Sequence, residues 1–76
     1  MKLTHMMKQE LYMSYVGGGG MYVNNRIPLL QTYEGLVRRG LMMHKPEEDS
    51  TTLTFFKLTD EGVRFAAELQ APIANE

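Results

Sequence analysis

The chain has 76 residues, of which 43% are hydrophobic and 22% charged, and its formal net charge is −1 at pH 7. This length suffices for one small domain but not for two, and the lack of cysteine excludes disulfides, thiolate metal sites and cysteine nucleophiles. No stretch has the apolar length of a membrane span and no secretory signal is recognisable, so we expect a cytoplasmic protein.

The first predicted element is a helix that Thr4 caps and that runs to about Tyr15. Apolar residues recur at every fourth position, which predicts a buried stripe of Leu3, Met7, Leu11 and Tyr15. Four glycines at 17–20 then end the helix, because each has too much backbone freedom to lose. We interpret this run as a flexible connector, since the lysine of a phosphate-binding loop is missing.

The clearest amphipathic helix follows a short strand at 21–23 and a turn at 24–25. It begins near Pro28, which a helix tolerates only in its first turn, and ends at Arg39 before a left-handed Gly40. Its apolar side is predicted to face the core with Ile27, Leu29, Leu30, Tyr33, Leu36 and Val37. Its other side is predicted to be exposed, with Gln31, Thr32, Gly35, Arg38 and Arg39.

A β-hairpin comes next, with strands at 41–44 and 51–58 around an exposed turn that contains Pro46 and three acidic residues. Thr59 is predicted to cap a third helix that runs to about Gln70 and stops at Pro72. The predicted buried side of this helix carries Val63, Ala66, Ala67 and Gln70, flanked by Phe65 and Leu69.

These elements predict a single α+β domain over residues 1–76, with a core of about 3–70 and a frayed tail at 71–76. The predicted order is helix, short strand, helix, β-hairpin, helix.

Two segments carry a family resemblance. Leu36-Val37-Arg38-Arg39-Gly40-Leu41-Met42 is similar to the signature that ends the recognition helix of winged-helix proteins. Phe56-Lys57-Leu58-Thr59-Asp60-Glu61-Gly62 is similar to the signature that joins their last wing strand to the final helix. Both occur in the family's order and at its usual separation, so residues 4–70 resemble a minimal winged-helix (winged helix-turn-helix) domain whose hairpin is the wing.

The chain departs from that family in two places. Residues 17–25 are too rich in glycine to supply the helix that precedes a recognition helix, so we expect a loop or strand there. The wing tip reads Glu47-Glu48-Asp49, where members that grip DNA with the wing carry Arg or Lys. Phosphate would repel these three charges.

The resemblance implies a transcriptional regulator that binds duplex DNA as a homodimer, with helix 28–39 in the major groove. On this reading Gln31 reads adenine and Arg38 reads guanine, and Thr32 lies on the same face. Gly35 leaves that face bare for a close approach. The predicted phosphate contacts are Arg26, Arg39 and Lys45.

The alternative is a protein-binding module on the same scaffold. Seven Met and four Tyr suit an adaptable interface, and we expect Met6, Tyr12 and Met13 to meet a second chain. The acidic tip of Glu47, Glu48 and Asp49 would meet a basic partner. In its small size the chain also resembles accessory proteins of phages and mobile elements, some of which inhibit host nucleic-acid machines such as CRISPR effectors. The sequence leaves DNA and protein open as targets.

Charge is unevenly spread along the chain. Residues 1–45 carry six Lys or Arg against two acids, whereas residues 46–76 carry two against seven. Either the basic half faces phosphate, or both halves are solvated surface. No Ser-centred elbow or paired carboxylates suggest catalysis, and we predict neither an enzyme nor a cofactor or small-molecule substrate. His5 and His44 lack further zinc ligands and are interpreted as surface residues.

Overall fold

The computed structural model describes residues 2–69, which form a small α+β structure with three helices and one antiparallel sheet. In chain order the elements are α1 (His5–Val16), β1 (Gly20–Asn24), α2 (Leu29–Arg38), β2 (Met42–His44), a 3-10 helix (Pro46–Glu48), β3 (Leu53–Leu58) and α3 (Asp60–Leu69). The predicted α+β class is confirmed.

The sheet has the order β1-β3-β2, with β3 in the centre. Tyr22 of β1 lies opposite Phe55, and His44 of β2 lies opposite Phe56. Because side chains alternate between the two faces of a strand, Phe55 and Phe56 point in opposite directions. The buried ring of Phe56 lies 5.3 Å from the ring of Tyr33 in α2. The helices therefore cover the Phe56 face, and Tyr22 on the other face is 51% exposed.

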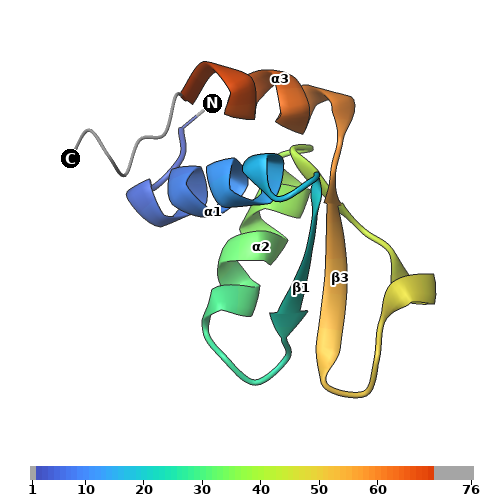
Figure 1. The fold of residues 1–76 in the computed structure, drawn as a ribbon. Coiled ribbons are helices and arrows are strands. Elements are labelled where there is room, and N and C mark those ends of the chain that lie inside the picture. Colours follow the sequence, from blue (N-terminus) through green and yellow to red (C-terminus); the bar gives the residue numbers. More distant parts are fainter. Residues whose placement is uncertain (1, 70–76) are drawn as a thin grey trace.

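α1 lies between the other two helices, with α3 above it and α2 below it in Figure 1. The segment that joins β2 to β3, with its 3-10 helix, lies away from the helices at the right of Figure 1. The core between the helices and the sheet consists of Leu3, Leu11, Val23, Tyr33, Leu36, Leu41, Met42, Phe56, Leu58 and Ala66. In this arrangement α1 packs against both α2 and α3.

α1 starts where its capping residue predicts. The hydroxyl of Thr4 accepts a hydrogen bond from the Met7 N–H at 3.1 Å, and Gly17 ends the helix. The predicted buried stripe is wrong at Tyr15, which is exposed, whereas Ser14 is fully buried. The reason is tertiary, because the Ser14 side of the last turn faces the ring of Tyr33.

α2 begins directly after Pro28, and Gly40 just past its end has a φ of 77°, as predicted. Two predictions for its faces are wrong. Ile27 precedes the helix and is exposed, because the chain is still in a turn there. Gly35 is buried, since α1 passes over it and a methyl group at this position would lie 2.7 Å from Cε of Met7.

The entry to α3 depends on close backbone contact. Thr59 caps the helix by accepting the Gly62 N–H at 3.0 Å, as predicted. Gly62 is buried against the Leu41 carbonyl, which shifts the buried side of α3 towards Gly62 and Ala66. The predicted buried positions Val63 and Ala67 are therefore exposed.

The predictions for Gln70, Pro72 and the tail 71–76 lie outside the described residues.

The glycine-rich segment before α2 forms β1, in agreement with the expectation of a loop or strand in place of a helix. Gly18 and Gly19 make the turn into this strand with φ values of 103° and 95°. The resulting arrangement is compatible with a winged-helix-like fold. Among the described residues, no helix has the length and apolar character needed to cross a membrane.

Candidate binding surfaces

The outward face of α2 consists of three exposed side chains, Gln31, Glu34 and Arg38. They are spaced by three and four residues, so they lie in one line along the helix. Gln31 and Arg38 are predicted DNA-reading residues, whereas Glu34 is absent from the predicted set, although its spacing from both would have revealed it. A carboxylate thus stands between the two side chains predicted to read bases.

The predicted contacts Thr32 and Arg39 are half-buried on the flank of α2 that includes Gly35. Nη1 of Arg39 donates a hydrogen bond to the Gly35 carbonyl at 2.9 Å. The exposed glycine predicted for close approach is instead covered by Met7. This flank is therefore part of the contact between α1 and α2 and offers little free surface for DNA.

Among the predicted phosphate contacts, Lys45 also interacts with another side chain of the protein. Its Nζ lies 3.4 Å from Oε2 of Glu47, and the side chain is half-buried. Arg26 is exposed in the turn before α2, where its backbone N–H donates to Oδ1 of Asn24 at 2.8 Å. Within residues 2–69, the side chains of Arg26 and Arg38 form no ion pair, and they lie at opposite ends of α2.

The acidic tip of the hairpin is partly used to hold the hairpin together. Oδ1 of Asp49 accepts the Phe55 N–H at 2.8 Å, and Oδ2 lies 2.6 Å from Nε2 of His44. Both interactions favour the carboxylate and lower the pKa of Asp49. A backbone hydrogen bond and the neighbouring Lys45 likewise lower the pKa of Glu47. Asp49 thus acts mainly in the fold, whereas Glu48 is exposed.

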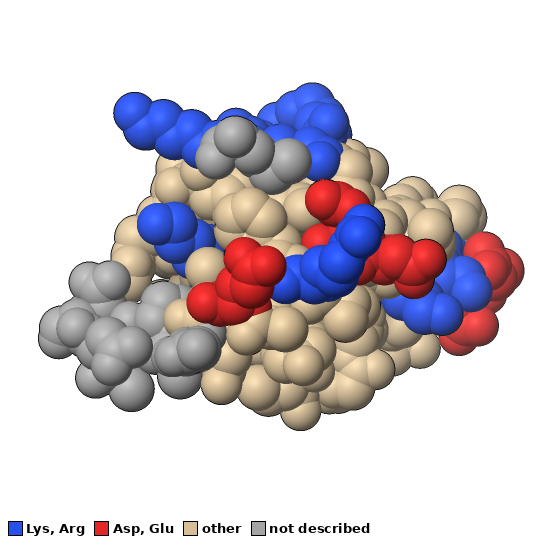
Figure 2. Space-filling view, turned by 90° about the horizontal axis from the view of Figure 1, so that it is seen from above, with Lys and Arg blue, Asp and Glu red and all other residues tan. Residues whose placement is uncertain are grey.

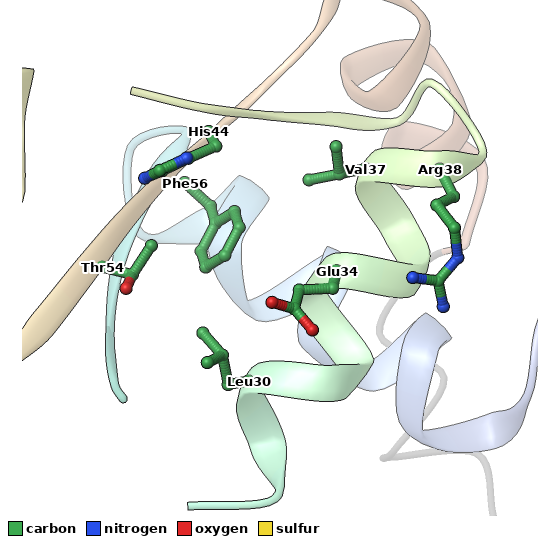
Figure 3. Close-up of a pocket in the computed structure, with 7 residues that line it drawn as sticks. All are labelled: Leu30, Glu34, Val37, Arg38, His44, Thr54 and Phe56. Atoms are coloured by element: carbon green, nitrogen blue, oxygen red, sulfur yellow. The ribbon is translucent and has the colours of Figure 1, made fainter. Parts of the chain in front are cut away.

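A groove of about 490 Å³ separates α2 from the hairpin (Figure 3). The α2 side contributes Leu30, Glu34, Val37 and Arg38, and the strands contribute His44, Thr54 and Phe56. In Figure 3 the carboxylate of Glu34 points towards the groove, whereas the guanidinium of Arg38 lies on the far side of the helix. The groove is therefore apolar at its base and carries one carboxylate at its rim.

Exposed apolar side chains also lie on α1 and on the sheet. On α1, Met6 is 47% and Met13 46% exposed, and Tyr12 is half-buried with its ring 6.4 Å from that of Tyr15. On the sheet face that the described helices leave open, the Tyr22 ring packs against the Phe55 ring at a tilt of 50°, with ring centroids 4.6 Å apart. The structure thus places the three predicted partner-binding residues of α1 at or near the surface, but it does not bring them together with the hairpin acids.

Charges of opposite sign are interleaved over much of the α3 side of the molecule, as Figure 2 shows. Lys and Arg gather without acids only along one edge of this view, whereas acidic side chains lie across its middle and at its right end. A duplex-binding protein needs a wider stripe of positive charge than this edge provides.

A buried polar network joins α1 to α2. The Tyr33 hydroxyl donates to Oε1 of Glu10 at 2.9 Å and lies 3.3 Å from Oγ of Ser14. Burial and the neighbouring carboxylate raise the pKa of Tyr33 well above its usual range. Because its polar atoms are paired, this network acts in packing and offers no reactive group.

The part of the chain that the structure describes contains no cluster of three or more His, Cys, Asp or Glu side chains suited to a metal ion. Comparison of the chain with protein-family models, with curated proteins and with solved structures finds no match.

Proposed function

We propose that this chain is a non-enzymatic binding module on a minimal winged-helix scaffold, and that its principal target is a protein. The observation that carries the proposal is Glu34, which stands between Gln31 and Arg38 on the outward face of α2. A recognition helix that enters a DNA groove passes close to two rows of phosphates, and a carboxylate at its centre opposes that approach.

The basic residues offer little compensation for this carboxylate. Arg39 is bonded to the backbone of its own helix, and Lys45 is paired with Glu47. The hairpin that would contact the DNA backbone carries Glu48 at its tip. Arg26 and Arg38 are the two predicted basic contacts without such an interaction within residues 2–69, and so small a basic set gives weak duplex binding at physiological salt.

The surface suits a protein partner better. Exposed methionines on α1 and the exposed Tyr22 on the sheet are residue types that protein interfaces favour. The acidic hairpin tip favours a partner with a basic surface. Proteins that hold nucleic acid present such surfaces, so a host nucleic-acid machine is the class of partner that we propose.

The proposal is tested by two measurements on the same purified, tagged chain. The first is fluorescence anisotropy with mixed-sequence duplex DNA across a salt series, for the natural chain and Arg38→Ala. The second is isolation of stoichiometric complexes from host cells, again with both proteins. We expect no duplex binding at low salt and a protein complex that survives Arg38→Ala.

A second candidate function is duplex DNA binding by α2, because Gln31 and Arg38 are exposed on the helix and Arg26 is exposed just before it. Neither arginine forms an ion pair within residues 2–69. It predicts an affinity that falls steeply with salt and a smaller salt slope for Arg38→Ala. That result, without a protein complex, would replace the first proposal with a homodimeric regulator. Arg38→Ala is preferable to Arg39→Ala, since Arg39 also contacts the Gly35 carbonyl.

A further inference from the structure

The groove between α2 and the hairpin has an apolar base built from three residues. Leu30 and Val37 project from α2 about two turns apart, and Phe56 lies opposite them on β3 (Figure 3). Leu30 and Val37 are half-buried, so both keep surface that a partner can cover. Covering such apolar surface is favourable because it removes that surface from water.

Glu34 is a charged residue of this groove whose side chain has no partner within residues 2–69. Its carboxylate points towards the space between Leu30 and Phe56 in Figure 3. In residues 2–69 no ion pair or hydrogen bond engages its side chain, although Arg38 lies one turn further along the helix. A partner that covered the apolar base would remove water from this carboxylate, so it must supply a cation or hydrogen-bond donors in exchange.

The other titratable groups around the groove do not fill this role. His44 faces the groove from β2, but its Nε2 is engaged with Asp49. Arg38 also lines the groove, yet its guanidinium lies on the far side of α2 (Figure 3). Arg26 lines the adjoining hollow at the start of α2, and it forms no ion pair with Glu34. The unpaired carboxylate of Glu34 therefore favours a positive side chain beside it.

The shape of the surface favours an extended occupant. A second hollow of about 380 Å³ lies at the start of α2 and shares Leu30 and Glu34 with the groove. It also includes Arg26, Ile27 and Gln31. The two hollows together follow α2 from its first turn to its last, with Glu34 where they meet. A continuous polypeptide segment fits such a path better than a compact molecule.

We propose that the groove between α2 and the hairpin binds an extended protein segment in which a Lys or Arg pairs with Glu34 and adjacent apolar side chains cover the exposed parts of Leu30 and Val37. The inference rests on the proposed protein-binding function and names the chemistry of the partner. It assigns specificity to Glu34, a residue outside the set that the sequence suggests.

The test is selection from a library of random 12-residue peptides displayed on phage, with the natural chain as bait. The selected peptides are then synthesised and titrated by fluorescence anisotropy. We expect them to carry Lys or Arg beside Leu, Ile or Phe. Glu34→Gln should weaken their binding about tenfold, because one side of a partly desolvated charge pair is lost. The matched control is Glu68→Gln, an exposed acid on α3, which should leave the affinity within about twofold.

Selection of no peptide, selection of acidic or uncharged peptides, or equal affinity for the natural chain and Glu34→Gln would each overturn this inference. The proposed protein-binding function is tested separately, by the host complex and by duplex binding. A stoichiometric host complex that is indifferent to Glu34→Gln would keep the protein-binding function and place the interface elsewhere. Salt-sensitive duplex binding without any such complex would remove both. Circular dichroism of each variant confirms that the fold is retained.

Discussion

Substitution of Gly62 by alanine tests the way in which α3 docks on the rest of the structure. A methyl group at this position would lie 2.0 Å from the Leu41 carbonyl oxygen, whereas carbon and oxygen atoms normally approach to about 3.3 Å. The Leu41 carbonyl cannot easily move, because it also accepts the Thr59 N–H at 3.2 Å. The start of α3 must therefore shift by roughly 1 Å to admit the methyl group.

The magnitude follows from two opposing effects. In a solvent-exposed helix, alanine in place of glycine would stabilise the fold by about 1 kcal/mol. Here overpacking costs about 1–3 kcal/mol, and loss of the Thr59 cap costs about 1 kcal/mol more. We expect Gly62→Ala to be destabilising by about 2 kcal/mol, which lowers the melting temperature by roughly 8–16 °C in a domain of this size.

The assay is urea and thermal unfolding followed by circular dichroism. Ala67→Gly is the matched control, because residue 67 is exposed on the same helix and should lose only about 1 kcal/mol. The sign of the Gly62→Ala effect is decisive. A variant as stable as the natural chain, or more stable, would show that α3 does not enter against the Leu41 backbone, and the reasoning would be refuted.

Three further predictions concern the α1–α2 contact, the sheet and the hairpin. Tyr33→Phe should lower the free energy of unfolding by about 1–3 kcal/mol, because it leaves the buried Ser14 hydroxyl unpaired. Additive effects of Tyr33→Phe and Ser14→Ala on the free energy of unfolding, measured in a double-mutant cycle, would contradict this pairing. Gly20→Ala should lower the urea midpoint, since its methyl group would lie 2.5 Å from the Phe55 ring; an unchanged midpoint would mean that the ring moves aside freely. The folded-state pKa of Asp49 is lowered, so its contribution to stability is present above about pH 4 and is lost as the pH falls through the lowered value. Asp49→Asn should therefore make the urea midpoint less sensitive to acid. Equal acid sensitivity in the natural chain and the variant would show that Asp49 does not stabilise the hairpin in this way.

Positions of the elements follow from the sequence because their signals act within one or two turns of backbone. Thr4 and Thr59 supply a hydroxyl to an N–H three residues later, and Gly40 adopts a left-handed conformation that other residues avoid. The glycine run before α2 cannot hold a helix, so a strand occupies that segment. These contacts need no knowledge of what packs against the helix, so the sequence predicts the starts of α1 and α3 and the end of α2. The strand bounds differ by one or two residues from those predicted, and the segment expected as an exposed turn contains a 3-10 helix at Pro46–Glu48.

Tertiary structure alone decides which flank of each helix is covered. Gly35 is buried because α1 crosses α2 there, and Ser14 is buried because it meets Tyr33 across that contact. Val63 lies on the apolar side of α3 by periodicity, yet it is exposed because Gly62 brings the helix in at another angle. Burial of a residue depends on which other helix or strand packs against it, and the hydrophobic pattern of a single helix does not give that information. The spacing of Glu34 places it on the outward face of α2, but only the placement of the hairpin beside α2 shows that this residue borders an apolar groove.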